Sequence, residues 1–247
     1  MSSRERAHSL ILAGKVRAGD VVIDKPGRLV TEDVALNIQA DSNPYVGRGG
    51  LKLAHGLQIF NIDPTGKVAV DIGASTGGFT DCLLQHGARK VFAVDVGYGQ
   101  LDWKLQSDQR VTIVDRKNAR HLALADIEGE PVDLAVIDVA FISLKLILPP
   151  TMAVLQPAGE IVALVKPQFE VGREEVENKG VIRDRKKHLK VLLELHAFVA
   201  EQGWVLAGLT PSPITGQKGN REYLIHCREK THGTALDASL IPERIEG

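Results

Sequence analysis

The sequence predicts an α/β protein with a mostly parallel sheet, preceded by a small α+β module. From residue 45 onward, short continuous apolar runs alternate with helical segments, as is typical of parallel strands covered by helices on both faces. Before residue 40, a helical segment is followed by brief alternating strands, as in a separate hairpin-rich unit. The 247 residues suffice for one large domain or two unequal ones.

The composition is that of a globular protein. Hydrophobic residues make up 44% of the chain and charged residues 25%, enough for a substantial core. Thirty Lys and Arg residues against 31 Asp and Glu residues give a formal charge of −1, so RNA would have to bind through local patches. Cys82 and Cys227 stand alone and the histidines are scattered. We therefore expect no metal site, no disulfide framework, and a reducing cytoplasmic setting.

The first 40 residues predict a helix followed by short strands. Leu10 and Ile11 recur at helical spacing behind a serine cap candidate, and Gly14 follows as a stop. The strands are bounded by the turn pairs Gly19-Asp20, Pro26-Gly27 and Glu32-Asp33. A polar, proline-containing stretch follows, so we place the first module at residues 1–40 and a linker at 41–45.

The rest of the chain predicts alternating strands and helices in one domain over residues 46–230. The expected elements are a helix at 50–60, a strand at 68–73, a helix at 78–86, strands at 90–97, 111–115, 133–141 and 160–169, a long amphipathic helix at 186–203, and closing strands at 204–214 and 222–228. Residues 231–247 lack periodicity and are expected to form a flexible tail.

A Gly-rich turn follows the strand at 68–73. Asp71 lies near the end of that strand, and Gly73, Ser75 and Gly77 lie in the turn before the next helix. Such a turn lets the backbone approach a ligand at the carboxyl edge of a sheet, although many such turns serve only packing. The spacing is not GxGxxG, which favours a nucleoside-type ligand and disfavours a nicotinamide-dependent dehydrogenase.

Acidic residues end the next two strands. Asp95 follows Gly73 by 22 residues, the place where a carboxylate can accept hydrogen bonds from both ribose hydroxyls. Asp115 ends the third strand, with Asn118 close behind and suited to the base end of the same ligand. The alternative is that these acids only cap helices.

Seven segments form a combined pattern. They are YVGRGGLKL at 45–53, DIGASTGGFTDCLL at 71–84, AVDVGYGQL at 93–101, DVAFISL at 138–144, LVKPQFEVG at 164–172, GVIRD at 180–184 and GNREYL at 219–224. Together they resemble the TlyA (hemolysin A) family of FtsJ-like rRNA 2′-O-methyltransferases. The resemblance implies a Rossmann-like fold, S-adenosylmethionine as cofactor, cytidines of 16S or 23S rRNA as target, and rRNA or ribosomal subunits as partners. It also implies that Phe79 shapes the cofactor pocket.

Four residues in these segments resemble the catalytic tetrad of the FtsJ-type enzymes, namely Lys52, Asp138, Lys166 and Glu222. Removing the proton of a ribose 2′-hydroxyl needs a base, and burial beside a second cation lowers the pKa of a lysine. Lys166 is then the expected base, lowered in proton affinity by Lys52 and oriented by Asp138, while Glu222 positions Lys52 or the ribose. Each could instead be an ordinary surface or strand-end residue. Against this, Lys166 ends a strand expected to be buried on both faces.

The N-terminal segment resembles the second helix and hairpin of an S4 RNA-binding domain. The candidate RNA contacts are Arg4, Arg6, Lys15 and Arg17. The apolar helix that ordinarily precedes this segment is not found, so the module is expected to be incomplete. Residues 172–190 contain seven Lys or Arg residues and four Asp or Glu residues; they could guide an RNA backbone or form a solvated loop.

Two other functional classes compete. One is a catalytically silent RNA-binding or ribosome-assembly factor, against which the complete tetrad argues. The other is a membrane-active hemolysin, as the family's older name suggests. The sequence has neither a secretory signal nor an apolar run of about 18 residues, and we expect no membrane association. The pattern sets no oligomeric state.

Overall fold

The computed structural model describes residues 7–8, 10–11, 14–19, 21–31, 33–38, 43–172, 174 and 180–245. The chain divides into two compact units, Met1–Pro44 and Tyr45–Gly247. This division falls inside the predicted linker.

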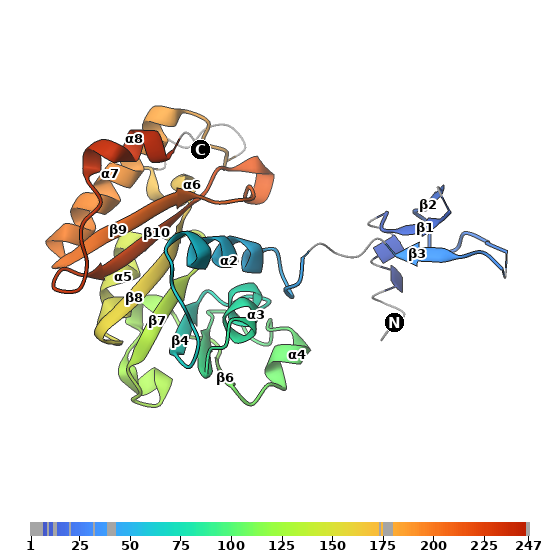
Figure 1. Ribbon diagram of the computed structural model, residues 1–247, viewed down its shortest axis with the longest axis horizontal. Helices are drawn as coiled ribbons and strands as arrows, with labels where there is room; N and C mark the ends of the chain where they lie inside the picture. The colour runs from blue at the N-terminus through green and yellow to red at the C-terminus, as the bar shows by residue number, and fades with distance from the viewer. Residues whose placement is uncertain are drawn as a thin grey trace. The chain divides into compact units, whose positions relative to one another are not determined.

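The first unit contains a three-stranded antiparallel sheet in the order β2-β1-β3 (Figure 1). The central strand β1 (Val16–Ala18) pairs with β2 (Val21–Ile23) and with β3 (Leu36–Ile38). Of the helix predicted before Gly14, residues 7–8 and 10–11 are helical and the remainder lies outside the described residues.

The second unit is built on a seven-stranded sheet in the order β6-β5-β4-β7-β8-β10-β9. The first five strands in this order are parallel, and β10 runs antiparallel to both of its neighbours. The prediction of a mostly parallel α/β sheet is confirmed. The strands are β4 (Val68–Ile72), β5 (Lys90–Val94), β6 (Val111–Val114), β7 (Val132–Ile137), β8 (Leu155–Val165), β9 (Trp204–Pro211) and β10 (Tyr223–Glu229).

Helices cover both faces of this sheet (Figure 1). Residues Val68, Val70 and Ile72 of β4 pack into the apolar cluster of one face, whereas Ala69 packs into that of the other. Since successive side chains of a strand point to opposite faces, a strand covered on both sides is mostly apolar, and in β4 only Asp71 is not. One face carries α2 (Gly49–Ile59) and α3 (Gly78–Gln85), and the other carries α5 (Leu148–Met152), α7 (Arg185–Glu201) and α8 (Ile241–Arg244).

The C-terminal segment corrects one prediction. Residues 231–247 were expected to be a flexible tail, but Ile241 and Ile245 are buried in the core beside α7. The carbonyl oxygen of Leu236 also accepts a hydrogen bond from His196 Nε2, at 2.9 Å. A four-residue helix is too short to show an amphipathic period in a sequence, so neither Ile241 in α8 nor Ile245 directly after it is recognisable as a core residue.

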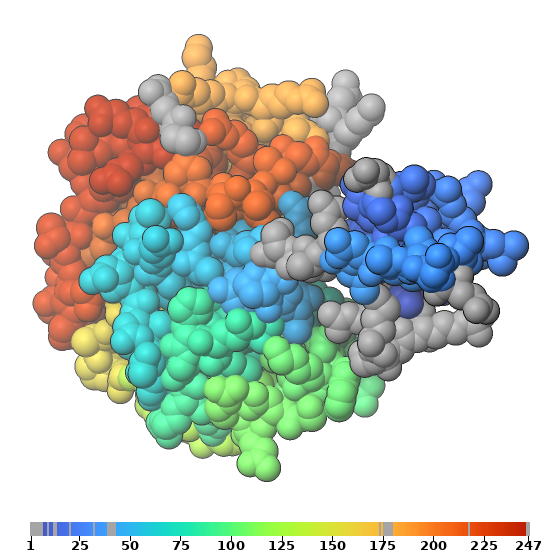
Figure 2. Space-filling view, turned by 45° about the vertical axis from the view of Figure 1, so that its right-hand side comes forward, coloured from blue at the N-terminus to red at the C-terminus, as the bar shows by residue number. Residues whose placement is uncertain are grey.

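Segments far apart in the sequence meet at the surface of the second unit. In Figure 2 the cyan surface of α2 borders the orange segment that precedes β10. Arg48, just before α2, donates a hydrogen bond to the carbonyl oxygen of Thr215 at 3.2 Å. Within the described ranges, every helix is too short or too polar to cross a lipid bilayer.

Candidate active site

Four polar residues gather at the carboxyl edge of the parallel strands. Asp138 directly follows β7 and Lys166 directly follows β8. Glu222 directly precedes β10, whose antiparallel direction makes it begin at the same edge. Lys52 is contributed by α2. All four line one cavity of about 330 Å³, so the structure brings the predicted tetrad together from four separate segments.

Within this cavity each lysine is paired with one carboxylate. Lys52 Nζ lies 2.5 Å from Glu222 Oε2, and both side chains are at most 10% exposed. Lys166 Nζ lies 2.6 Å from Asp138 Oδ1, with side chains 14% and 21% exposed. The Lys166–Asp138 pair is therefore the more accessible of the two from the cavity.

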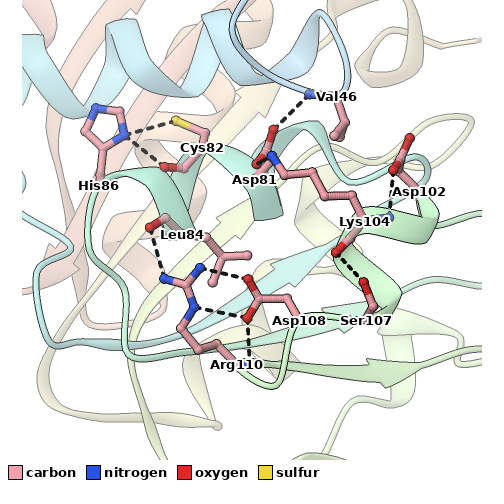
Figure 3. Close-up of polar contacts among 10 residues, drawn as sticks. All are labelled: Val46, Asp81, Cys82, Leu84, His86, Asp102, Lys104, Ser107, Asp108 and Arg110. Atoms are coloured by element: carbon pink, nitrogen blue, oxygen red, sulfur yellow. Dashed lines mark hydrogen bonds and ion pairs between the residues drawn. The ribbon is translucent and has the colours of Figure 1, made fainter. Parts of the chain in front are cut away.

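The loop that leads into α2 is held in place by α3. The backbone N–H of Val46 donates to Asp81 Oδ2 at 2.9 Å, and Asp81 Oδ1 pairs with Lys104 Nζ at 3.1 Å (Figure 3). Asp81 itself is buried. The loop presents Gly47 and Arg48 to the cavity, so this anchoring fixes one wall of the site.

Two glycines allow the turn between β4 and α3. Gly73 has φ +85°, and a Cβ there would lie 2.5 Å from the carbonyl oxygen of Asp138. Gly77 has φ +97°, and a Cβ there would overlap the side chain of Leu105. Both positions have a positive φ and no room for a Cβ atom, so each of them requires glycine. The turn thus lies directly against the loop that carries Asp138.

Asp71 lies in β4, just before this turn, and is fully buried. Its Oδ2 accepts a hydrogen bond from Thr80 Oγ1 at 2.6 Å. Burial raises the pKa of Asp71 to about 7, and the nearby charges of Asp138 and Asp95 act in the same direction. Asp71 therefore connects β4 to α3 from inside the protein and does not line the cavity.

A second cavity, of about 400 Å³, adjoins the first and shares Gly73, Ser75 and Asp138 with it. Asp95 and Asn118 also line it. The carboxylate of Asp95 accepts backbone N–H groups on both oxygens, from Ser75 at 2.8 Å and from Gly97 at 2.7 Å. Apolar lining is provided by Val94, Val96, Ile142 and Ile147.

The other described residues that were predicted to bind the cofactor or RNA do not line the second cavity. Phe79 lines the tetrad cavity, and Gly77 and Asp115 line neither cavity. Asp115 Oδ2 instead accepts the N–H of Gly99 at 2.9 Å. In the first unit, Arg17 lies on β1 and Lys15 directly precedes it. The predicted contacts Arg4 and Arg6 fall outside the described residues.

The structure adds an aromatic pair that the sequence analysis did not single out. Phe141 is 87% exposed with φ +63°, and its ring centroid lies 4.9 Å from that of Phe169. Both residues line the tetrad cavity. Glu170 follows Phe169 in the short helix α6 (Pro167–Glu170). It ties this helix to the segment after Phe141 by accepting hydrogen bonds from Ser143 Oγ at 2.6 Å and from the N–H of Leu144 at 2.8 Å. Both phenylalanines stand inside quoted motifs, but no residue pattern distinguishes a cavity phenylalanine from a core one.

Comparison with known proteins finds one matching family model and several similar chains. The model of the FtsJ-like methyltransferase family matches residues 45–229. YqxC of Bacillus subtilis (strain 168), assigned as an rRNA methyltransferase, is 48% identical over 224 residues, which cover 91% of this chain and 80% of YqxC. The 16S/23S rRNA (cytidine-2′-O)-methyltransferase TlyA of Mycobacterium tuberculosis is 44% identical over 230 residues, 93% of this chain and 85% of TlyA.

A solved structure is similar over the full length. A protein of Streptococcus thermophilus assigned as a hemolysin superposes with a TM-score of 0.83 at 42% sequence identity. The superposition covers 100% of this chain and 90% of that one. The likeness therefore extends over both units.

Proposed function

Because the chain belongs to the family of FtsJ-like methyltransferases, we propose that it methylates a ribose 2′-hydroxyl of ribosomal RNA with S-adenosylmethionine as methyl donor. The relative named for 16S/23S rRNA cytidine-2′-O methylation, at 44% identity, supports cytidine as the target nucleotide and the cytoplasm as the place of action. The observation that carries the proposal is the meeting of Lys52, Asp138, Lys166 and Glu222 in one cavity beside a second, nucleoside-sized one.

The residues of the second cavity fit the adenosine part of the donor. Each oxygen of Asp95 accepts one backbone N–H, and a carboxylate oxygen has a further lone pair with which to accept a ribose hydroxyl. Asn118 offers an amide for the base, and Val96 and Ile142 offer apolar surface for its flat faces. S-adenosylmethionine supplies an electrophilic methyl group bound to a sulfonium.

Lys166, in its uncharged amine form, is the group that we assign to proton removal. A ribose hydroxyl is a poor nucleophile, so its proton must leave as the oxygen attacks. Lys166 faces the cavity and is held by Asp138 at 2.6 Å. Asp138 is anchored in turn, since its N–H donates to the carbonyl oxygen of Ile72 at 2.9 Å. The lysine is thereby oriented by the sheet and not by a mobile loop.

Lys52 and Glu222 form a buried ion pair that lines the same cavity. Their ion pair joins α2 to the start of β10. We assign Lys52 to the electrostatic stabilisation of negative charge that develops on the ribose oxygen, and Glu222 to holding Lys52 in place. Fixed charges in a cavity that excludes water are effective because they need no reorganisation during the reaction.

The first unit is assigned to RNA binding. Lys15 and Arg17 lie at and beside the central strand of its sheet, and the predicted contacts Arg4 and Arg6 belong to the same module. Cations on a small module are suited to phosphate contacts, which position a protein on RNA without reading its sequence.

Methyl transfer to ribosomal subunits tests the proposed function. The protein is incubated with labelled S-adenosylmethionine and small or large subunits from cells that lack the modification, and the RNA is digested to nucleosides. We expect the label in 2′-O-methylcytidine. Label on a base would contradict the ribose assignment, and unlabelled RNA despite bound donor would favour a silent binding protein.

A further inference from the structure

We propose that a third, basic cavity beside the tetrad binds a backbone phosphate of the RNA strand whose ribose is methylated. The inference rests on the proposed function and specifies where its substrate strand runs. The cavity measures about 290 Å³ and is lined by residues of two loops, with Arg183 from one and Lys218 and Arg221 from the other.

The floor of this cavity is held in place by hydrogen bonds. His188 is buried, with Nδ1 2.8 Å from Tyr223 Oη and Nε2 2.9 Å from the carbonyl oxygen of Ile182. Because a carbonyl oxygen only accepts hydrogen bonds, Nε2 donates to Ile182. Both ring nitrogens therefore have partners within the chain, which fixes the orientation of the ring.

Three cations line this cavity, namely Arg183, Lys218 and Arg221. A concentration of fixed cations on two joined loops suits a phosphate.

The two loops are held together by Asn220, which is buried. Its Nδ2 donates to the carbonyl oxygen of Gly180 at 3.0 Å, and its Oδ1 accepts the N–H of Ile182 at 3.1 Å. The cations are therefore displayed on a preformed frame. Such preorganisation lowers the entropic cost of binding.

The same loop borders both cavities, which points to RNA as the ligand. Thr215 accepts a hydrogen bond from Arg48, which lines the tetrad cavity, and Gly216 packs against the carboxylate of Glu222. Lys218 and Arg221, a few residues further on, line the basic cavity. A strand that places one ribose at Lys166 and continues across this loop would bring an adjoining phosphate to the basic cavity.

The test compares RNA binding by variants of the full-length protein. Unmodified 16S and 23S rRNA transcripts are titrated between about 50 and 200 mM salt. For R183Q/R221Q we expect roughly tenfold weaker binding and a plot of log K against log salt that is less steep by about one for each lost contact. R183K/R221K, which keeps both charges, should keep the wild-type slope.

A matched control removes two arginines from the opposite edge of the sheet. Arg89 and Arg110 precede β5 and β6 and pair with Glu130 and Asp108. R89Q/R110Q should retain the wild-type slope. Unchanged melting temperature and unchanged affinity for S-adenosylhomocysteine show that each variant remains folded.

The outcomes separate the site from the reaction. A slope for R183Q/R221Q equal to that of R89Q/R110Q would overturn the phosphate site, as would an equal loss in R183K/R221K. If the wild-type protein bound RNA with the expected slope but transferred no methyl group, the proposed reaction would fail while the site stood. A wild-type protein that binds neither transcript overturns the site.

Discussion

Nζ of Lys166 lies 2.6 Å from Oδ1 of Asp138, at the edge where β8 and β7 end side by side. The pair is thus built by two adjacent parallel strands. Tyr223 of β10 is in register with Val165 of β8, which brings Glu222 to the same edge. Three of the four tetrad residues are therefore positioned by one sheet, and only Lys52 depends on a helix.

Replacing Lys166 tests its assignment as the base. K166A should lower the rate of methyl transfer by about 10² to 10⁴-fold, the usual contribution of a general base. Affinity for S-adenosylhomocysteine should stay near wild type, because Asp95 and Asn118 lie in the other cavity. Single-turnover transfer to ribosomal subunits and calorimetric titration measure the two quantities.

Lys145 supplies the matched control for this variant. It forms an ion pair with Glu194 at 2.9 Å, and both side chains are more than a third exposed. K145A should therefore leave transfer unchanged. Turnover retained by K166A would remove Lys166 from the reaction.

The buried pair of Lys52 and Glu222 makes stability as well as activity sensitive to substitution. E222Q leaves the ammonium of Lys52 without its carboxylate in a site where it is only 10% exposed. Loss of one partner of a buried pair costs about 3 to 5 kcal/mol in free energy of unfolding. K52M/E222Q removes both charges and should recover most of that loss while remaining inactive. Urea unfolding of the three proteins checks this, and equal stability of E222Q and the wild type would contradict it.

Much of the fold could be predicted because its signals are local. The strands around Val70 and Val136 show as continuous apolar runs in the sequence, and the helix at 186–203 shows as an amphipathic period. All three are present in the structure. The packing of Ile241 could not be predicted, since a single buried turn depends on contacts with α7 that no local pattern encodes.

The candidate site was predictable as a set of residues but not in its geometry. The resemblance implied that Asp138 orients Lys166 and that Glu222 positions Lys52 or the ribose, and these residues form the two ion pairs of the cavity. The meeting of Glu222 with the others depends on the register of β10, which no motif encodes. The left-handed backbone of Phe141 is likewise imposed by the loop that Glu170 anchors. The roles of the tetrad residues stay predictions until the variants are measured.

Asp71 should make stability depend on pH. In the folded protein its pKa is raised to about 7, from 3.8 in the absence of burial. Between these values the folded state binds more protons than the unfolded state, so the contribution of Asp71 to the free energy of unfolding falls as pH rises from about 4 to about 7 and is constant above. D71N keeps an oxygen for the Thr80 hydroxyl but cannot titrate.

Urea unfolding of wild type and D71N at several pH values measures this effect. The wild type should lose stability relative to D71N across that pH window, by an amount that the difference between the two curves isolates from other titrating groups. Parallel curves would show that Asp71 is ionised in the folded protein.

Asp95 should govern affinity for the methyl donor. D95A removes the carboxylate expected to bind the ribose hydroxyls and also leaves the N–H groups of Ser75 and Gly97 without their acceptor. We expect the dissociation constant of S-adenosylhomocysteine to rise at least tenfold, which corresponds to a loss of about 1.4 kcal/mol in binding free energy. D102A, which loses only the acceptor for Lys104 N–H at 2.9 Å, is the control. Unchanged affinity in D95A would place the ribose elsewhere.

Gly73 tests whether the turn and Asp138 are coupled through direct contact. G73A introduces a Cβ that would lie 2.5 Å from the carbonyl oxygen of Asp138, at a residue with φ +85°. Gly66 also has positive φ, +72°, but no atom lies within 4 Å of the position of its added Cβ. G66A should therefore lower the free energy of unfolding only by the cost of placing alanine at positive φ, about 1 to 2 kcal/mol.

G73A carries that penalty and must in addition push the Asp138 loop away from Lys166. We expect G73A to unfold at a lower temperature than G66A and to lose methyl transfer by at least tenfold, whereas G66A keeps the wild-type rate at temperatures where it is folded. Thermal unfolding and single-turnover transfer, measured on both variants, separate the two contributions. If G73A and G66A behaved alike in both measurements, the contact between the turn and Asp138 would have no part in positioning the base.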